Sequence, residues 1–282
     1  MKIAVTGATG FIARHLIPIL KADHEIIAIA RFQDPAAHYP WLDGIEKVAM
    51  DITNPQKDMF ALMGKPDALI HLAWGGLPNY KSPDHLIEGA KHLLFLSHAM
   101  ENGLKNITVI GTCFEYGMKN GELSENDITE PSNPYGLAKD SLRKALEFLT
   151  ADKSCTFRWI RLFYLYGEGQ NQNSLLSQLD RAIESKEPIF NMSGGEQLRD
   201  YLPVEKAARY IALIATQNAV DGIINCCSGN PISVRKLIEN RIKEKSADIS
   251  LNLGFYPYPD YEPMAFWGNN TLLNQIIKGN HQ

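Results

Sequence analysis

The sequence has 282 residues, of which 45% are hydrophobic and 21% charged, and its formal net charge is −4. This length allows one large α/β domain, or one domain with a small lobe, and the composition excludes a disordered, collagen-like or coiled-coil protein. The slight acidity provides no general attraction to nucleic acid or to an anionic membrane, so neither is expected as a partner.

Short apolar stretches alternate with segments of helical periodicity along the first part of the chain. Strands are expected at residues 3–6, 25–30, 47–52, 68–72, 107–111 and 157–162. Helices are expected at residues 11–20, 86–102 and 134–149, the last with a proline in its first turn. This alternation predicts an α/β fold, a Rossmann-type doubly wound parallel sheet with helices on both faces.

The pattern changes after residue 164. Gly, Asn, Gln and Ser are frequent at residues 167–174, and a loop rich in Pro and Tyr is expected at 255–267. Between them we expect a strand at 222–226 and helices at 175–184, 204–215 and 234–243. The sequence therefore predicts a dinucleotide-binding core over residues 1–164 and a smaller C-terminal α/β substrate lobe, mainly residues 165–282, interleaved with the core.

The cysteines and the N-terminus bear on the compartment. The four cysteines form no Cys-x-x-Cys pair, which argues against a structural zinc site and a disulfide framework. No signal-peptide pattern is present, and no apolar run is long enough to cross a bilayer. We expect a cytoplasmic protein with reduced thiols, no metal site and no membrane partner.

Residues 6–13 read Thr-Gly-Ala-Thr-Gly-Phe-Ile-Ala and join the first strand to the first helix. Gly7 allows a tight turn, and Gly10 lets the backbone approach a pyrophosphate that the helix N-terminus would bind. This context predicts dinucleotide binding, with a plain strand-to-helix turn as the alternative. The second strand runs into Arg31 rather than an acid, and an arginine suits a 2′-phosphate. NADP is therefore favoured over NAD, unless Arg31 is simply a solvated surface residue.

Tyr135 and Lys139 lie four residues apart, on one face of the predicted helix. A nearby ammonium lowers the pKa of a tyrosine from its usual value of about 10, which suits acid–base catalysis. Thr112 ends the fifth strand, where such sheets bind ligands, and its hydroxyl can orient a substrate carbonyl. Glu115 follows on a turn that either faces the cleft or lies on the surface.

These segments together resemble the extended short-chain dehydrogenase/reductase family, of the NAD-dependent epimerase/dehydratase type. The matching segments are residues 6–12, 51–52, 71–74, 111–117, 161–170, 199–204 and 225–234. The resemblance implies that Tyr135 is the general acid/base, that Lys139 lowers its pKa and holds the nicotinamide ribose, and that Thr112 orients the substrate oxygen. The cofactor contacts are then expected at Thr6, Gly7, Thr9, Gly10, Phe11, Ile12, Arg31, Asp51, Ile52, Leu72, Ala73, Trp74, Tyr135 and Lys139.

The substrate is expected to contact Cys113, Glu115, Tyr164, Asn173 and Arg199. The bidentate guanidinium of Arg199 suits a substrate diphosphate, with a salt link between domains as the alternative. Cys113 and Phe114 stand where a dehydratase has its acidic pair, which argues against a 4,6-dehydratase. The helices at 86–102 and 134–149 are similar to those that form the family's dimer interface, so a homodimer is expected, although both are also ordinary sheet-covering helices.

The resemblance favours a reductase that uses NADPH on a nucleotide-linked 4-keto-6-deoxy sugar at C4. Three alternatives stay open. The first is a UDP-hexose 4-epimerase with tightly bound NAD. The second is a non-catalytic NADP-binding sensor or scaffold, because a fold does not fix a function. The third is a reductase of a small carbonyl without a nucleotide, against which Arg199 argues.

Overall fold

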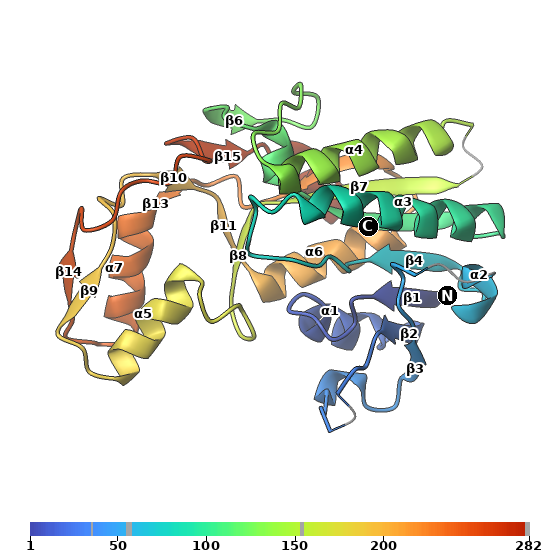
Figure 1. Cartoon of the computed structure of the whole chain (residues 1–282), viewed down its shortest axis with the longest axis horizontal. Coiled ribbons are helices and arrows are strands. Elements are labelled where there is room, and N and C mark those ends of the chain that lie inside the picture. Colours follow the sequence, from blue (N-terminus) through green and yellow to red (C-terminus); the bar gives the residue numbers. More distant parts are fainter. Residues whose placement is uncertain (35, 55–57, 153–154, 280–282) are drawn as a thin grey trace.

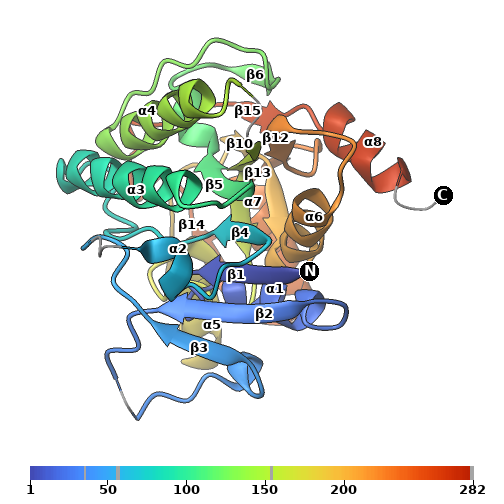
Figure 2. The same ribbon diagram turned by 90° about the vertical axis from the view of Figure 1, so that its right-hand side faces the viewer.

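The computed structural model describes residues 1–34, 36–54, 58–152 and 155–279. At its centre is a seven-stranded parallel sheet in the order β12-β7-β5-β4-β1-β2-β3 (Figures 1 and 2). Its strands are β1 (Lys2–Thr6), β2 (Glu25–Ala30), β3 (Glu46–Ala49), β4 (Ala68–His71), β5 (Asn106–Thr112), β7 (Thr156–Leu162) and β12 (Gly222–Cys226). The predicted doubly wound parallel sheet is confirmed. The strand order reverses between β1 and β4, and a ligand crevice is expected at their carboxyl ends.

Helices cover both faces of the sheet because side chains alternate along each strand. Ile3 and Val5 face α1 (Ala13–Leu20), α6 (Val204–Thr216) and α8 (Thr271–Gly279). Ala4 faces the other layer, made of α2 (Met59–Leu62), α3 (Asp84–Glu101) and α4 (Pro134–Leu149). Figure 2 shows α3 and α4 on one side of the sheet and α6 and α8 on the other.

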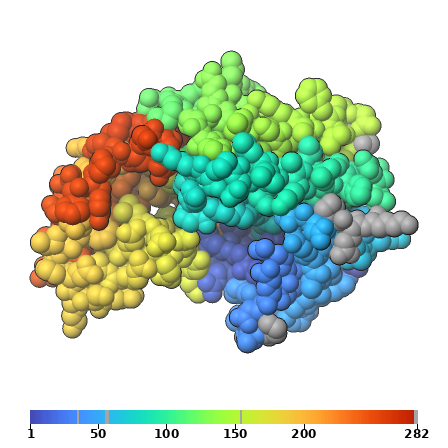
Figure 3. Space-filling model, in the orientation of Figure 1, coloured from blue at the N-terminus to red at the C-terminus, as the bar shows by residue number. Residues whose placement is uncertain are grey.

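A smaller lobe lies beyond the carboxyl ends of the strands, at the left of Figure 1. Its core is formed by α5 (Leu175–Glu184) and α7 (Val234–Glu244), packed on the parallel pair β9 (Ile189–Asn191) and β14 (Ser250–Asn252). The space-filling view shows that the surface is hollowed between this lobe and the core (Figure 3).

Three further two-stranded pairs and two short 3₁₀ helices complete the described elements. The pairs are β8 (Tyr164–Tyr166) with β11 (Tyr201–Pro203), β10 (Leu198–Arg199) with β13 (Ile232–Ser233), and β6 (Gly121–Leu123) with β15 (Phe266–Gly268). The 3₁₀ helices are η1 (Pro40–Leu42) and η2 (Cys113–Tyr116). No helix in the described residues is long and apolar enough to cross a membrane.

The bounds of the elements differ from the sequence expectations in a few places. The third strand ends at Ala49 instead of continuing to residue 52, and helix α8 was not expected. Phe266 and Trp267 were assigned to a loop but lie in β15, which pairs with β6 about 145 residues earlier. Strand β15 is stabilised by pairing with a strand that is far away in sequence, so no local alternation of apolar and polar residues indicates it. Three elements after residue 164, namely α6, β12 and α8, belong to the core.

Candidate active site

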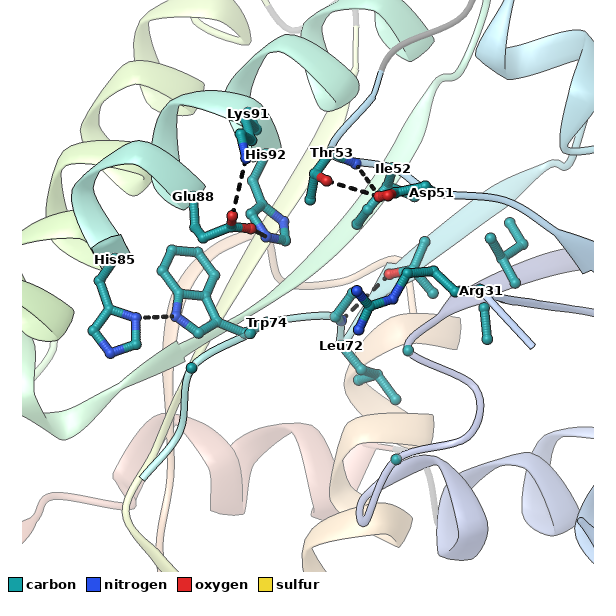
Figure 4. A pocket seen from close by; sticks show the side chains of 18 of the residues that line it. Arg31, Asp51, Ile52, Thr53, Leu72, Trp74, His85, Glu88, Lys91 and His92 are labelled. Atoms are coloured by element: carbon teal, nitrogen blue, oxygen red, sulfur yellow. Dashed lines mark hydrogen bonds and ion pairs between the residues drawn. The ribbon is translucent and has the colours of Figure 1, made fainter. Parts of the chain in front are cut away.

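A cavity of about 810 Å³ opens at the carboxyl ends of the central strands. Ten of the residues predicted to contact the cofactor line it, namely Thr6, Gly7, Thr9, Gly10, Arg31, Asp51, Ile52, Leu72, Ala73 and Trp74 (Figure 4). They come from the first strand and turn, the end of β2, the segment after β3 and the segment after β4. Phe11 and Ile12 are not part of this lining, and the Phe11 ring packs edge-on against His15.

The glycine-rich turn fits a dinucleotide. Gly7 has φ +68°, and a Cβ there would lie 2.9 Å from the backbone N and Cα of Ala73. Only glycine therefore allows the turn to approach the segment after β4 so closely. The cap residue of α1, Ile12, offers no side-chain acceptor to the first turn. The backbone N–H groups of Arg14 and His15 donate to the Gly10 and Ile12 carbonyl oxygens, which leaves, among the described residues, those of residues 11–13 for a phosphate.

Arg31 and Asp51 lie at the far end of the same cavity. Asp51 accepts hydrogen bonds from the Thr53 backbone N at 3.0 Å and from the Thr53 hydroxyl at 2.7 Å. These bonds, helped by the charge of Arg31, lower the pKa of Asp51. The site therefore presents one fixed carboxylate and one exposed guanidinium to a ligand.

The structure brings Thr112, Tyr135 and Lys139 together beside this cavity. Asn133 caps α4 by accepting a hydrogen bond from the Gly136 backbone N at 2.8 Å, so that the tyrosine and the lysine lie on its first two turns. A hydrogen bond to Thr112 favours the phenolate of Tyr135, but burial is the larger effect and raises the pKa of Tyr135. Lys139 Nζ donates to the Ile110 carbonyl oxygen at 2.8 Å, and burial lowers the pKa of Lys139 to about 7.

The sequence predicted that Lys139 lowers the pKa of Tyr135, and in the ligand-free protein the net direction is the opposite. The reason is the position of the ammonium. It lies against the Ile110 carbonyl and the face of the Trp74 indole, and the low dielectric around Tyr135 penalises the phenolate.

A second cavity, of about 330 Å³, lies between the lobe and the C-terminal loop. Tyr164 and Arg199 line it, together with Phe190, Gln197 and Glu262. Gln197 Oε1 is buried with no hydrogen-bond partner among the described residues. A pocket of this size with an unsatisfied polar atom is suited to a small polar ligand.

Comparison with known proteins agrees with this arrangement. Residues 3–227 match the model of the NAD dependent epimerase/dehydratase family. The chain belongs to this family.

Two curated relatives come from Aggregatibacter actinomycetemcomitans. The chain is 34% identical to dTDP-6-deoxy-L-talose 4-dehydrogenase (NAD(+)) over 95% of this chain and 99% of that protein. It is 24% identical to GDP-6-deoxy-D-talose 4-dehydrogenase over 98% of this chain and 91% of the relative. Among solved structures, UDP-glucuronic acid 4-epimerase from Bacillus cereus, in complex with UDP-glucuronic acid and NAD, has a TM-score of 0.82 at 23% identity, covering 99% and 93% of the two chains. That last similarity shows the fold.

The sequence predicted that Glu115 contacts the substrate, but its side chain does not face the cleft. Its side chain is fully buried. One carboxylate oxygen accepts from Trp159 Nε1 and from the Thr112 backbone N, each at 2.9 Å, and the other accepts from Arg161 Nε at 2.8 Å. Glu115 therefore fixes the end of β5 and the position of Thr112, and it has no contact available for a substrate.

The other residues predicted to contact the substrate lie in different surroundings. Cys113 is buried next to Thr112, and burial raises the pKa of its thiol. Asn173 is exposed and lines neither cavity; its backbone N donates to Asn171 Oδ1 at 2.8 Å. Arg199 forms an ion pair with Glu262, 2.9 Å from Nη2 to Oε2, so the salt link is present inside the second cavity.

Sequence analysis missed a group of α3 side chains in the first cavity, namely His85, Glu88, Lys91 and His92 (Figure 4). His92 Nδ1 lies 2.7 Å from His71 Nε2, and His71 Nδ1 lies 2.9 Å from the Thr6 hydroxyl. Burial lowers the pKa of both histidines, that of His92 to about 3, so both rings are neutral at pH 7. The seven-residue spacing of His85 and His92, two helical turns, was the available signal.

Proposed function

We propose that the protein is a nicotinamide-dependent oxidoreductase of nucleotide sugars that reduces a 4-keto-6-deoxy hexose at C4. The observation that carries this proposal is the position of Thr112, Tyr135 and Lys139 beside a cavity suited to a dinucleotide and near a smaller cavity that contains Arg199. The name of the 34% identical relative, a 4-dehydrogenase of a dTDP-linked 6-deoxy sugar, supports the same carbon and the same substrate class. A 4-dehydrogenase and a 4-reductase catalyse one reaction in opposite directions.

The residues present fit the cofactor. Gly7 leaves room for a close backbone approach, and the N–H groups of residues 11–13 at the start of α1 are the donors that a phosphate can use. When bound, the reduced nicotinamide supplies a hydride. Reduction of a ketone also needs a proton for the oxygen, and Tyr135 is placed to donate it, with Thr112 hydrogen-bonding that oxygen. The raised pKa of Tyr135 keeps its hydroxyl protonated, as an acid requires.

The cofactor preference follows from Arg31, which lies at the end of β2 in the dinucleotide cavity. An arginine at this position accommodates the 2′-phosphate of NADP, whereas an acid would bind the ribose hydroxyls of NAD. The proposal is therefore NADP(H) as the preferred cofactor and NAD(H) as the weaker one. NAD is named for the dTDP-sugar relative, so both cofactors belong in every assay.

The same proposal includes a homodimer formed through α3 and α4. Both helices carry exposed apolar side chains, namely Leu86, Ile87, Leu94, Leu137 and Phe148, the last 85% exposed. Apolar side chains spread over two adjacent helices are typical of an interface. Light scattering after gel filtration should give twice the chain mass for the wild type and a monomer for Leu94→Asp. The four cysteines are free and buried, which supports the cytoplasm as the compartment.

The experiment that tests the catalytic assignment is Tyr135→Phe. Losing the hydroxyl should reduce kcat by about 10²- to 10⁴-fold, the usual contribution of a positioned acid. Binding of NADPH, followed by fluorescence, should stay unchanged because the ring and Lys139 remain. Turnover equal to that of the wild type would overturn the assignment.

A further inference from the structure

The indole of Trp74 lies across the catalytic pair. Lys139 Nζ is 3.8 Å from the centre of the Trp74 ring system, a cation held over an aromatic face. The ring of Tyr135 meets the same indole edge-on, with centroids 5.9 Å apart and an interplanar angle of 72°. Trp74 thus contacts both members of the pair from the side of the dinucleotide cavity.

The indole is fixed from two directions by histidines of α3 (Figure 4). His92 stacks on it at 4.7 Å with an angle of 21° between the planes. Trp74 Nε1 donates to His85 Nδ1 at 3.1 Å, so the other His85 nitrogen carries a hydrogen and donates to the Asn79 carbonyl oxygen at 2.9 Å. Turning the indole away from Lys139 would break this chain of contacts.

The ammonium of Lys139 needs neighbours that stabilise its charge, because it is buried away from water. The residue is 2% exposed, and its Nζ is held by one carbonyl oxygen, that of Ile110. Glu115 is a supporting charge, but its carboxylate is engaged by Arg161 and Trp159. The titratable groups that interact with the Lys139 charge are Glu115 from η2, His71 from β4 and His92 from α3. Both histidines are neutral, so neither stabilises the ammonium.

We propose that Trp74 is a positioning residue, which holds the Lys139 ammonium over the face of its indole, next to the Ile110 carbonyl oxygen, and keeps it charged. The role rests on the proposed function, because Lys139 matters for turnover if Tyr135 transfers the proton. The attraction between a cation and the ring quadrupole stabilises the charged form alone, so Trp74 raises the pKa of Lys139 against the effect of burial. A smaller ring has a weaker effect, and an aliphatic side chain has none.

The test is a titration of Lys139 in the ligand-free protein, followed by NMR of ¹⁵N-labelled lysine side chains and assigned with Lys139→Met. The variants are Trp74→Phe and Trp74→Leu, and Trp267→Phe in β15 is the matched control. The midpoint should fall in the order Trp, Phe, Leu, by about 0.5–1.5 pH units from Trp to Leu. The control should keep the wild-type midpoint.

The pH at which kcat declines on the alkaline side is expected to fall in the same order, from the wild type through Trp74→Phe to Trp74→Leu. An unchanged midpoint in a folded Trp74→Leu protein overturns the proposal, and if that variant does not fold, an unchanged midpoint in Trp74→Phe does so. The titration needs no substrate, and it therefore gives its answer even if every nucleotide sugar fails as a substrate. Failure of the proposed function and failure of the role of Trp74 are thus seen separately.

Discussion

The guanidinium of Arg199 directs two nitrogens to one carboxylate oxygen of Glu262, Nη2 at 2.9 Å and Nε at 3.3 Å. The two side chains are 2% and 11% exposed and both line the smaller cavity. The arginine predicted to meet a substrate diphosphate is therefore already neutralised by a carboxylate of this chain. A diphosphate that enters the cavity competes with Glu262 for Arg199.

Glu262→Gln should separate two effects of the Glu262 carboxylate, which stabilises the buried Arg199 and competes with a diphosphate for it. Removing the carboxylate leaves a buried cation without its partner, which should cost about 1–3 kcal/mol of unfolding free energy. It should also lower Kd for dTDP by about 3- to 10-fold, since a repulsion of about 1 kcal/mol is removed. Thermal melting with and without dTDP measures both effects. Glu239→Gln, at an exposed ion pair of the same lobe, is the control. Equal protection of Glu262→Gln and wild type by dTDP would contradict the competition.

Gly7→Ala tests the dinucleotide turn, and Gly44→Ala is a close control. Both glycines have a positive φ, +68° and +73°, so alanine strains the backbone at each by about 1 kcal/mol. A Cβ at residue 44 meets nothing within 4 Å, whereas one at residue 7 lies 2.9 Å from Ala73. Calorimetry should therefore show weaker NADPH binding in Gly7→Ala alone, by about tenfold or more. Loss of binding in both variants would assign the effect to strain.

Arg31→Asp should exchange the cofactor preference. The variant loses a charge-assisted contact to a 2′-phosphate and gains an acceptor for ribose hydroxyls, which corresponds to about a 10- to 100-fold change in the NADPH/NADH ratio of kcat/KM. Lys47→Asp makes the same charge change on the neighbouring strand, outside the cavity, and should leave the ratio unaltered. A ratio that does not move in Arg31→Asp would show that Arg31 is only a solvated surface residue.

The burial of Lys139 predicts a dependence of stability on pH. The pKa of Lys139 is about 7 in the folded protein and has its ordinary value of 10.5 in the unfolded chain, so the unfolded chain binds more protons between these pH values. The contribution of Lys139 to stability therefore rises with pH across this window, and at pH 7 and below the buried ammonium is destabilising. Lys139→Met should stabilise the protein by about 1–2 kcal/mol at pH 7, and by less at pH 10. Urea unfolding at the two pH values checks the sign, and a variant less stable than wild type at pH 7 would contradict it.

Local patterns in the sequence were enough to predict the strands and main helices of the core and the proximity of Thr112, Tyr135 and Lys139 to the first cavity. Helix α4 begins at Pro134 after the capping Asn133, so residue types alone placed Tyr135 and Lys139 on it. The burial of Glu115 could not be predicted, because Trp159 and Arg161, which bind it, are more than 40 residues away in sequence. Glu262 lies in a stretch without periodicity, and its partner Arg199 is 63 residues earlier. Contacts between residues so far apart in sequence arise from tertiary packing, so local sequence patterns do not predict them.

The most direct test of the central claim is the absorbance of reduced nicotinamide when the purified protein is mixed with NADPH or NADH and a panel of 4-keto-6-deoxy nucleotide sugars, beginning with the dTDP-linked one. The proposal predicts stoichiometric loss of the reduced cofactor with at least one of them, faster with NADPH. No loss with any, together with NAD released from the denatured protein, would contradict a reductase and indicate an epimerase instead.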